Sequence, residues 1–137
     1  MTALKFTYPL TILERHLDTF GHVNNATYLE ILEEARWAII APRGYDIPAI
    51  REKQLGPVIL TFTMSFLKEL TLRQSIRVET QMLSYNRKIG EMQQNIYNEA
   101  NELCFESTLK LGLMDMKLRK LIPPTAEWLH AIGMPVE

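Results

Sequence analysis

A carboxylate and a helix start stand close together in the stretch from His16 to Asn25, which reads HLDTFGHVNN. Asp18 precedes a turn, and a run with helical spacing begins after Asn25. The first N–H groups of a helix lack internal acceptors and carry the positive end of its dipole. A carboxylate can attack a carbonyl or activate water, and free N–H donors can hold the oxygen that becomes negative. This combination is what acyl-transfer chemistry needs.

Local structure offers a second explanation for the same residues. Asp first and Gly fourth in Asp18–Gly21 are typical of a type I turn, in which the aspartate side chain bonds nearby backbone N–H groups. Asn24 and Asn25 are both good N-cap residues, so the chemical role at Asn25 falls to its backbone N–H. The side chain of His22 could line a pocket or form a hydrogen bond with a carbonyl of the turn, and we favour the hydrogen bond.

Length and composition describe an ordinary single domain spanning residues 1–137, with 47% hydrophobic and 23% charged residues. A formal net charge of -1 argues against a nucleic-acid binder, whose surface is usually strongly basic. Cys104 is the one cysteine, which excludes an internal disulfide framework and favours a reducing compartment. The sequence shows neither a signal peptide nor an apolar run long enough to span a membrane, so we expect a cytoplasmic protein.

The elements around the HLDTFGHVNN stretch follow from hydrophobic periodicity. Alternating apolar residues predict a strand over residues 5–17, and Pro9 requires an edge or a bulge there. Helical spacing predicts a long helix over 26–40, and we expect a loop over 45–57. Further strands and a short final helix are expected at 58–66, 76–82, 92–97, 103–113 and 125–132. Cys104 should lie on the face opposite the apolar series that begins at Leu103, as a packed or exposed bystander to any chemistry.

One long helix followed by four strands that hairpins can join indicates an α+β fold. Several strands that share an apolar face need the helix to cover it, so we expect an antiparallel sheet of about five strands curled around the helix. We find no repeat and no internal domain boundary.

At this point the chain resembles a known family. The run from Asp18 to Asn25, followed by Tyr28-Leu29 and by Glu33-Glu34-Ala35-Arg36, is similar to the hot-dog-fold thioesterases of the 4-hydroxybenzoyl-CoA thioesterase type. The resemblance extends more loosely over nearly the whole chain. Many relatives carry an acidic residue before the third strand, where this chain has Leu72-Arg73-Gln74.

The resemblance implies a hot-dog fold and hydrolysis of an acyl-CoA thioester to free acid and CoA. Asp18 would be the nucleophile or the general base, and the N–H of Asn25 would polarise the carbonyl. The resemblance further implies a homodimer or homotetramer whose sheets join edge to edge, with the acyl site at the subunit interface. No metal or other cofactor is expected, because a thioester carbonyl is already electrophilic.

Substrate contacts are expected from residues outside the reacting pair. His22 and Tyr28 are candidates for the acyl pocket, and Arg87 and Lys88 for the phosphates of CoA, which need Arg, Lys or backbone N–H partners. Glu34 is a second candidate catalyst, because another branch of hot-dog thioesterases takes its carboxylate from this helix. The plainer reading makes Glu33 and Glu34 solvated charges, with Glu33 spaced to pair with Arg36.

Two rival functions keep the fold. One is hydrolysis of acyl groups carried on acyl carrier protein, and the other is a non-catalytic acyl or lipid-binding module. The three histidines lack zinc-ligand spacing, and the chain has neither a G-x-S-x-G elbow nor a phosphate-binding glycine loop.

Overall fold

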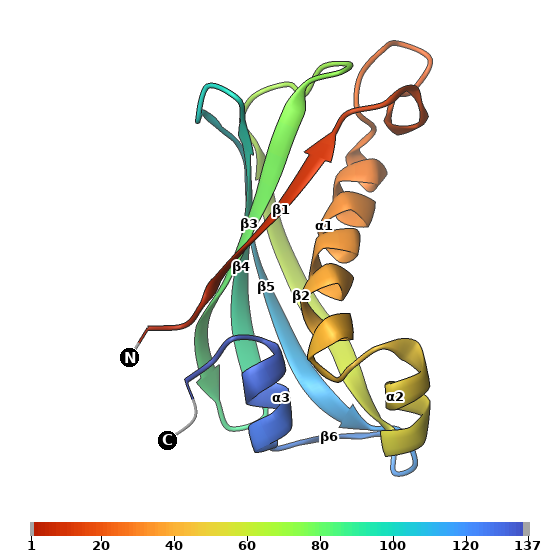
Figure 1. The fold of residues 1–137 in the computed structure, drawn as a ribbon, viewed down its shortest axis with the longest axis vertical. Coiled ribbons are helices and arrows are strands. Elements are labelled where there is room, and N and C mark those ends of the chain that lie inside the picture. Colours follow the sequence, from red (N-terminus) through yellow and green to blue (C-terminus); the bar gives the residue numbers. More distant parts are fainter. Residues whose placement is uncertain (1, 136–137) are drawn as a thin grey trace.

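An antiparallel sheet with a long helix along one face makes up the computed structural model, which describes residues 2–135 (Figure 1). The strands are β1 (Lys5–Thr11), β2 (Leu55–Phe66), β3 (Ser75–Asn86), β4 (Ile89–Asn98), β5 (Leu103–Asp115) and β6 (Lys120–Ile122). The helices are α1 (Asn25–Ile40), α2 (Ile47–Lys53) and α3 (Ala126–Ala131), with the 3-10 turns η1 (Glu14–His16) and η2 (Ala41–Arg43). Within the described residues the strand order is β1-β3-β4-β5-β2, and β6 pairs with β5.

The core lies between α1 and the sheet. Ile31, Leu32 and Ala35 on the inner side of α1 are buried, and they meet alternating buried residues of β3, β4 and β5. The outer side of α1 carries exposed glutamates and reaches water. This arrangement confirms the α+β class and the pairing of one long helix with an antiparallel sheet.

The first strand is shorter than the periodicity predicted. It ends at Thr11, because the chain then turns into η1, where the Leu13 N–H donates to Nδ1 of His16 at 2.9 Å. Pro9 lies in β1, which is an edge strand, as its missing N–H requires.

The expected loop over 45–57 is wrong for most of its length. Asp46 caps α2 by accepting from the Ala49 N–H at 2.9 Å, and Pro48 stands in the first turn, so the segment carries an ordinary helix-start signal. β2 then begins at Leu55 rather than at residue 58. The three-residue strand β6 is an addition to the five expected strands.

Cys104 lies on the inner side of the sheet with Phe105, although we expected it on the face opposite the apolar series that begins at Leu103. The pairing of β4 with β5 shifts between Ile96 and Tyr97, so that Phe105 opposes Ile96 while Leu103 opposes Tyr97. This bulge turns Cys104 into the core, where it is fully buried.

Candidate active site

The segment that connects η1 to α1 forms a closed loop. An isolated bridge joins Leu17 to Val23, and the Asp18 N–H donates to the carbonyl of His22 at 2.8 Å. The Gly21 N–H donates to the carbonyl of Asp18 at 3.1 Å, which confirms the predicted turn, and Gly21 has a φ of 80° that favours glycine. The loop holds Asp18 alongside His22, just before α1.

The carboxylate of Asp18 is fixed within this loop. Its Oδ1 accepts hydrogen bonds from the N–H groups of Phe20 at 2.9 Å and His22 at 3.2 Å. Such contacts are those of an aspartate that stabilises its own turn, and they also hold the carboxylate in one orientation. Over residues 2–135, Oδ2 makes no hydrogen bond with the protein. One oxygen therefore has a structural role and the other is available.

The first turn of α1 leaves a backbone donor free. Asn24 is the N-cap, and its side chain accepts from the Ala26 N–H at 2.8 Å. The Asn24 carbonyl accepts from Thr27 at 2.9 Å. In the described part of the chain the N–H of Asn25 has no protein acceptor. It points out of a 16-residue helix at the positive end of the dipole, as an oxyanion donor must.

An open cavity of about 400 Å³ adjoins this helix start. Its walls are His22, Val23, Asn25, Tyr28, Phe66 and Glu69. Tyr28 is buried, stacks on Phe105 with ring centroids 5.0 Å apart and meets Phe66 edge-on at 4.9 Å. Burial raises the pKa of the Tyr28 hydroxyl, so the ring is a neutral wall. Asp18 is not part of this wall in a single chain.

The ring of His22 faces a carboxylate across the cavity mouth. Its Nδ1 lies 2.6 Å from Oε1 of Glu69, so the favoured reading, a bond to a carbonyl of the turn, is wrong. Phe66 and Glu69 were not among the expected site residues. Phe66 is the last residue of β2 and Glu69 follows that strand, and only the pairing of β2 with β5 brings them beside the loop before α1.

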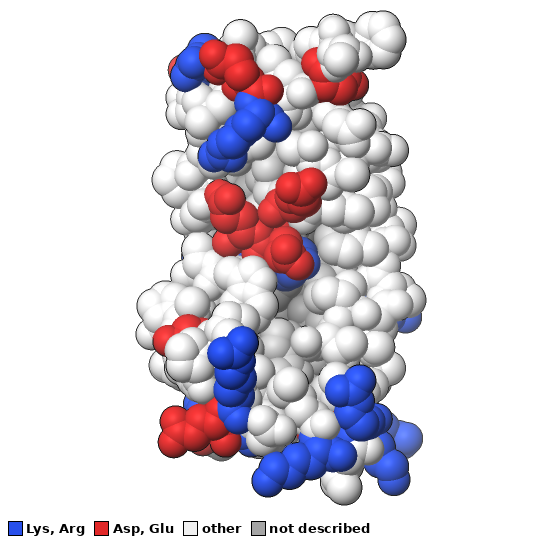
Figure 2. All heavy atoms as spheres, turned by 90° about the vertical axis from the view of Figure 1, so that its right-hand side faces the viewer, with Lys and Arg blue, Asp and Glu red and all other residues white. Residues whose placement is uncertain are grey.

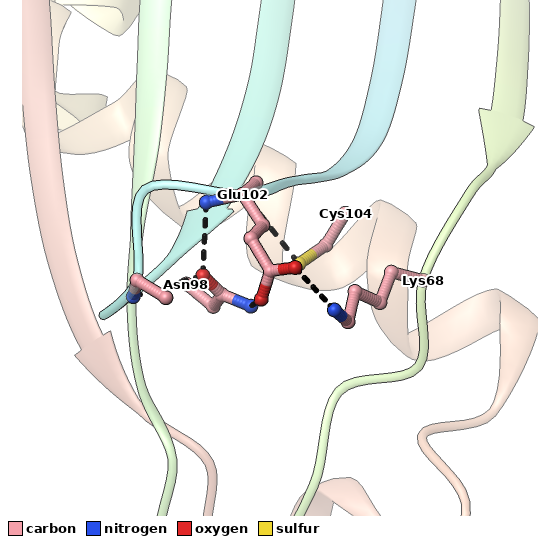
Figure 3. A network of polar contacts seen from close by, with 5 residues as sticks. Lys68, Asn98, Glu102 and Cys104 are labelled. Atoms are coloured by element: carbon pink, nitrogen blue, oxygen red, sulfur yellow. Dashed lines mark hydrogen bonds and ion pairs between the residues drawn. The ribbon is translucent and has the colours of Figure 1, made fainter.

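A polar network fixes the segment that carries Glu69 (Figure 3). Glu102 pairs with Lys68 and accepts from Asn98 Nδ2 at 2.9 Å, and these contacts lower the pKa of the Glu102 carboxyl. The Lys68 N–H also donates to the Cys104 carbonyl at 3.0 Å. The turn between β4 and β5 therefore positions one wall of the cavity.

Comparison with known proteins identifies the family. A family model described as the thioesterase-like superfamily matches residues 13–132. The chain belongs to the thioesterase-like superfamily. It is therefore a thioester hydrolase, with a hot-dog fold.

Individual relatives agree with this assignment. The long-chain acyl-CoA thioesterase FadM of Escherichia coli K12 is 27% identical over 108 residues, which cover 78% of this chain and 81% of that protein. The hypothetical protein SAV2348 from Staphylococcus aureus, solved in complex with CoA, is similar in fold with a TM-score of 0.87, 16% identity and coverage of 100% and 90%. The probable thioesterase YbaW from Escherichia coli has a TM-score of 0.80, 23% identity and coverage of 93% and 96%.

In one subunit of this thioesterase, Arg87 and Lys88 lie far from Asp18. They form the turn between β3 and β4, at the lower end of Figure 1, whereas the loop of Asp18 is at the upper end. The 12 residues of β3 separate the two ends by about 40 Å. Arg87 and Lys88 line a separate surface hollow with Lys110. A single chain therefore does not bring the expected phosphate contacts to the cavity.

Glu34 of the thioesterase lies on the other flank of α1. Its carboxylate accepts a hydrogen bond from the hydroxyl of Tyr8 on β1, and this contact raises the pKa of Tyr8. The side chain is outside the cavity that Asn25 lines. The neighbouring Glu33 does not form the expected pair with Arg36, whose guanidinium donates to Gln94 instead.

Neither a metal-ligand cluster nor a membrane-spanning helix is present in the described part of the thioesterase. Between residues 2 and 135 no three His, Cys, Asp or Glu side chains gather as a metal site. No helix of this described range is long and apolar enough to cross a membrane.

Proposed function

We propose that the protein hydrolyses acyl-CoA thioesters, with Asp18 and the backbone N–H of Asn25 as the reacting pair. The observation that carries the proposal is the Asn25 N–H, which has no acceptor within residues 2–135 and lies in the wall of an open cavity. The turn that precedes it holds a carboxylate in a fixed orientation. FadM, whose name specifies acyl-CoA, and the CoA complex of SAV2348 support CoA as the carrier.

The reaction follows one of two routes with the same products. In the first, Asp18 attacks the thioester carbon, the C–S bond breaks to release the CoA thiolate, and water hydrolyses the resulting mixed anhydride. In the second, Asp18 takes a proton from water, whose oxygen attacks the carbonyl directly, and the C–S bond then breaks to release the CoA thiolate, which takes up a proton. In both routes the Asn25 N–H donates to the carbonyl oxygen as negative charge develops there. One such donor commonly contributes about 10² to 10³ in rate.

The proposal includes a dimer in which the β2 strands of two copies pair antiparallel. Within the described residues β2 has no strand on its outer side, and its Ile59 and Leu60 are exposed. Antiparallel pairing reverses the second copy, so its β3–β4 turn comes to the end of the joined sheet where Asp18 lies. Arg87 and Lys88 of the second copy would then meet the phosphates of CoA, which one chain alone cannot provide.

A cytoplasmic location is part of the same proposal. The one cysteine, Cys104, is free and buried, as suits a reducing compartment.

Release of free thiol from acyl-CoA, followed with a thiol-reactive dye, tests the activity. We expect turnover by the wild type, and a loss of about 10² to 10⁴ in rate for Asp18→Asn with the fold retained. Acyl-CoA that binds without thiol release would instead support a binding module. Faster turnover of acyl groups on acyl carrier protein than on CoA would replace the proposed carrier. Normal turnover by folded Asp18→Asn would refute the role of Asp18.

A further inference from the structure

Two turns at one end of the sheet carry an unbalanced positive charge. The β3–β4 turn and the β5–β6 turn lie at the end of the molecule away from Asp18, at the bottom of Figure 1. Lys and Arg side chains gather over this end of the molecule in Figure 2. We call this surface the basic end, and its cations, all exposed, are Arg87, Lys88, Lys110, Lys117, Arg119 and Lys120.

The overall composition of the chain conceals this charge. The basic end holds six of the 15 Lys and Arg residues but only two of the 16 Asp and Glu residues, Glu91 and Asp115. The other nine basic and fourteen acidic residues give the remainder of the chain a net charge of -5. The total of -1 therefore combines two regions of opposite sign, and the basic end can attract an anionic partner.

The cations of the basic end lack the carboxylate partners that other cations of the chain have. Salt bridges to carboxylates are formed by Lys5, Lys53, Lys68, Arg73 and Arg77. Within residues 2–135, none of the six cations at the basic end forms an ion pair. These six charges do not hold the fold together through ion pairs, so they can meet an external anion.

Two arginines of the basic end occupy backbone positions that suit glycine better. Arg87 and Arg119 have φ values of 58° and 57°, in the left-handed region where a Cβ is crowded. Arg73 also has a positive φ, of 65°, but its guanidinium pairs with Glu14. The backbone gives no reason for arginine at positions 87 and 119, whereas a contact of the guanidinium outside the chain would explain both.

The two turns form one surface because both pack against β5. Gly112 on β5 has no side chain, and a Cβ there would lie 2.6 Å from Cδ2 of Leu121 and 2.9 Å from the carbonyl oxygen of Lys88. Strand β6 and the β3–β4 turn therefore meet at the same point of β5. One partner can contact the cations of both turns.

Each basic turn also exposes an apolar side chain. Leu118, in the β5–β6 turn, is 65% exposed. Asp115 fixes this turn, since its Oδ1 accepts from the N–H groups of Lys117 at 2.9 Å and of Leu118 at 3.0 Å. Ile89, which follows the β3–β4 turn, is 42% exposed. The basic end therefore combines unpaired cations with apolar side chains that project from its turns.

We propose that the basic end docks on an anionic phospholipid surface, with its cations at the headgroup phosphates and Leu118 at the boundary of the acyl chains. Anionic membranes attract clusters of about four to eight Lys and Arg residues, and apolar side chains beside them enter the interface. A site for one free phosphate needs donors that converge on a point, whereas these cations spread over two turns and a strand. An acidic protein would need a pocket for Leu118, whereas a lipid surface accepts it anywhere.

Docking would bring the proposed active site to its substrate. In the proposed dimer, each end of the joined sheet carries the Asp18 loop of one copy and the basic end of the other. A membrane at that end lies beside the cavity mouth, so acyl-CoA that partitions into the bilayer is the substrate class within reach. This link rests on the proposed function, whereas the docking itself rests on a single chain.

Co-sedimentation with vesicles tests the docking without turnover. The protein should partition about tenfold or more strongly onto vesicles of equal parts phosphatidylglycerol and phosphatidylcholine than onto pure phosphatidylcholine, and salt should weaken this binding. Lys117→Gln and Arg119→Gln together should weaken it about 10- to 30-fold, since each cation near an anionic surface contributes about fivefold. Equal partition of the wild type onto both kinds of vesicle would overturn the proposal.

The matched control removes two charges from another surface. Lys5→Gln and Arg77→Gln together lower the net charge equally, but both cations already face Glu79 on the sheet. This variant should bind the mixed vesicles as the wild type does. An equal loss of binding in the two double variants would show that net charge alone drives adsorption, which contradicts docking through the basic end.

Insertion of Leu118 has a readout of its own. On the mixed vesicles, Leu118→Trp should show a blue-shifted emission and quenching by brominated lipid, beyond the response of the two native tryptophans in the wild type. Leu4→Trp is the control, since Leu4 is 52% exposed outside the basic end, and its emission should not shift. No difference between the two variants would remove Leu118 from the lipid contact.

Other anionic partners would give other results. If inorganic phosphate displaces the protein from the mixed vesicles more strongly than chloride at equal ionic strength, the basic end is a phosphate site and the proposal is wrong. If acyl carrier protein binds through Lys117 and Arg119 while vesicles do not bind, the surface belongs to an acidic protein and the proposal is also wrong.

Turnover separates this inference from the proposed function. The variant changed at Lys117 and Arg119 should hydrolyse hexanoyl-CoA in solution at the wild-type rate, but palmitoyl-CoA held in the mixed vesicles about tenfold more slowly. If the wild type docks but hydrolyses no thioester, the proposed function is wrong and the docking stands. If it hydrolyses thioesters but does not dock, this inference is wrong and the proposed function stands.

Discussion

His22 and Glu69 are joined across the cavity mouth by a contact of 2.6 Å between Nδ1 and Oε1. The contact links the loop that carries Asp18 to the segment after β2, two parts of the chain that are distant in sequence. Both side chains are more than half exposed, so the pair is worth little in stability. Its importance is geometric, because it joins the loop that carries Asp18 to the cavity wall that Glu69 provides.

The first prediction concerns this pair. A double-mutant cycle with His22→Ala and Glu69→Gln should give a coupling free energy of unfolding of about 0.2–1 kcal/mol, measured by urea denaturation. Each single variant should lower kcat several-fold with a smaller effect on KM, because the Asp18 loop is less well held. Additive losses of kcat in the double variant would show that the contact does not position the loop.

A second prediction isolates the backbone donor. Asn25 is the first residue of α1, where proline is well tolerated, and Asn24 has the extended conformation that a residue before proline prefers. Asn25→Pro should therefore keep the helix while it removes the N–H, and should lower kcat by about 10² to 10³. Asn25→Ala keeps the N–H and serves as the control, with turnover near that of the wild type. Equal turnover of the two variants would exclude the oxyanion role.

The third prediction concerns pH and stability. His16 is 6% exposed, its Nδ1 accepts from Leu13, and burial lowers the pKa of its imidazole. In the unfolded chain the imidazole of His16 is protonated as the pH falls through about 6.5, whereas in the folded chain it stays neutral to a lower pH. The free energy of unfolding should therefore fall as the pH drops from about 6.5 toward the lower pKa of folded His16. Urea denaturation of wild type and His16→Gln should show this slope in the wild type only.

The matched control for pH is His130→Gln, since His130 is exposed. It should keep the wild-type slope. A His16→Gln variant with the full slope would show that other groups cause the pH dependence.

A fourth prediction addresses assembly. Leu60 is 41% exposed on the outer strand β2, and a lysine there should prevent edge pairing. Leu60→Lys should shift the protein from dimer to monomer in light scattering and reduce turnover, because the proposed site needs both copies. Leu118→Lys, in the turn between β5 and β6, should change neither property. A monomeric, active wild type would disprove the dimer.

Some features followed from the sequence because they are local. The turn at Asp18–Gly21 and the cap at Asn24 depend on residues within four positions, and both are confirmed. Hydrophobic alternation likewise predicted the strands β3 and β5, because one buried face imposes a period of two. The helix-start signal at Asp46 was equally local and was missed.

What the sequence alone determined is therefore the short-range set: the Asp18 turn, the free N–H of Asn25 and the α+β order of elements. The tertiary structure decided which distant side chains meet, since that depends on strand register and helix rotation. Register brought Glu69 to His22, and a bulge turned Cys104 inward. The rotation of α1 about its axis directs the Arg36 side chain toward Gln94 on the sheet rather than toward Glu33. Spacing along the helix indicates that Glu33 and Arg36 can pair, but it cannot reveal a buried acceptor on another element.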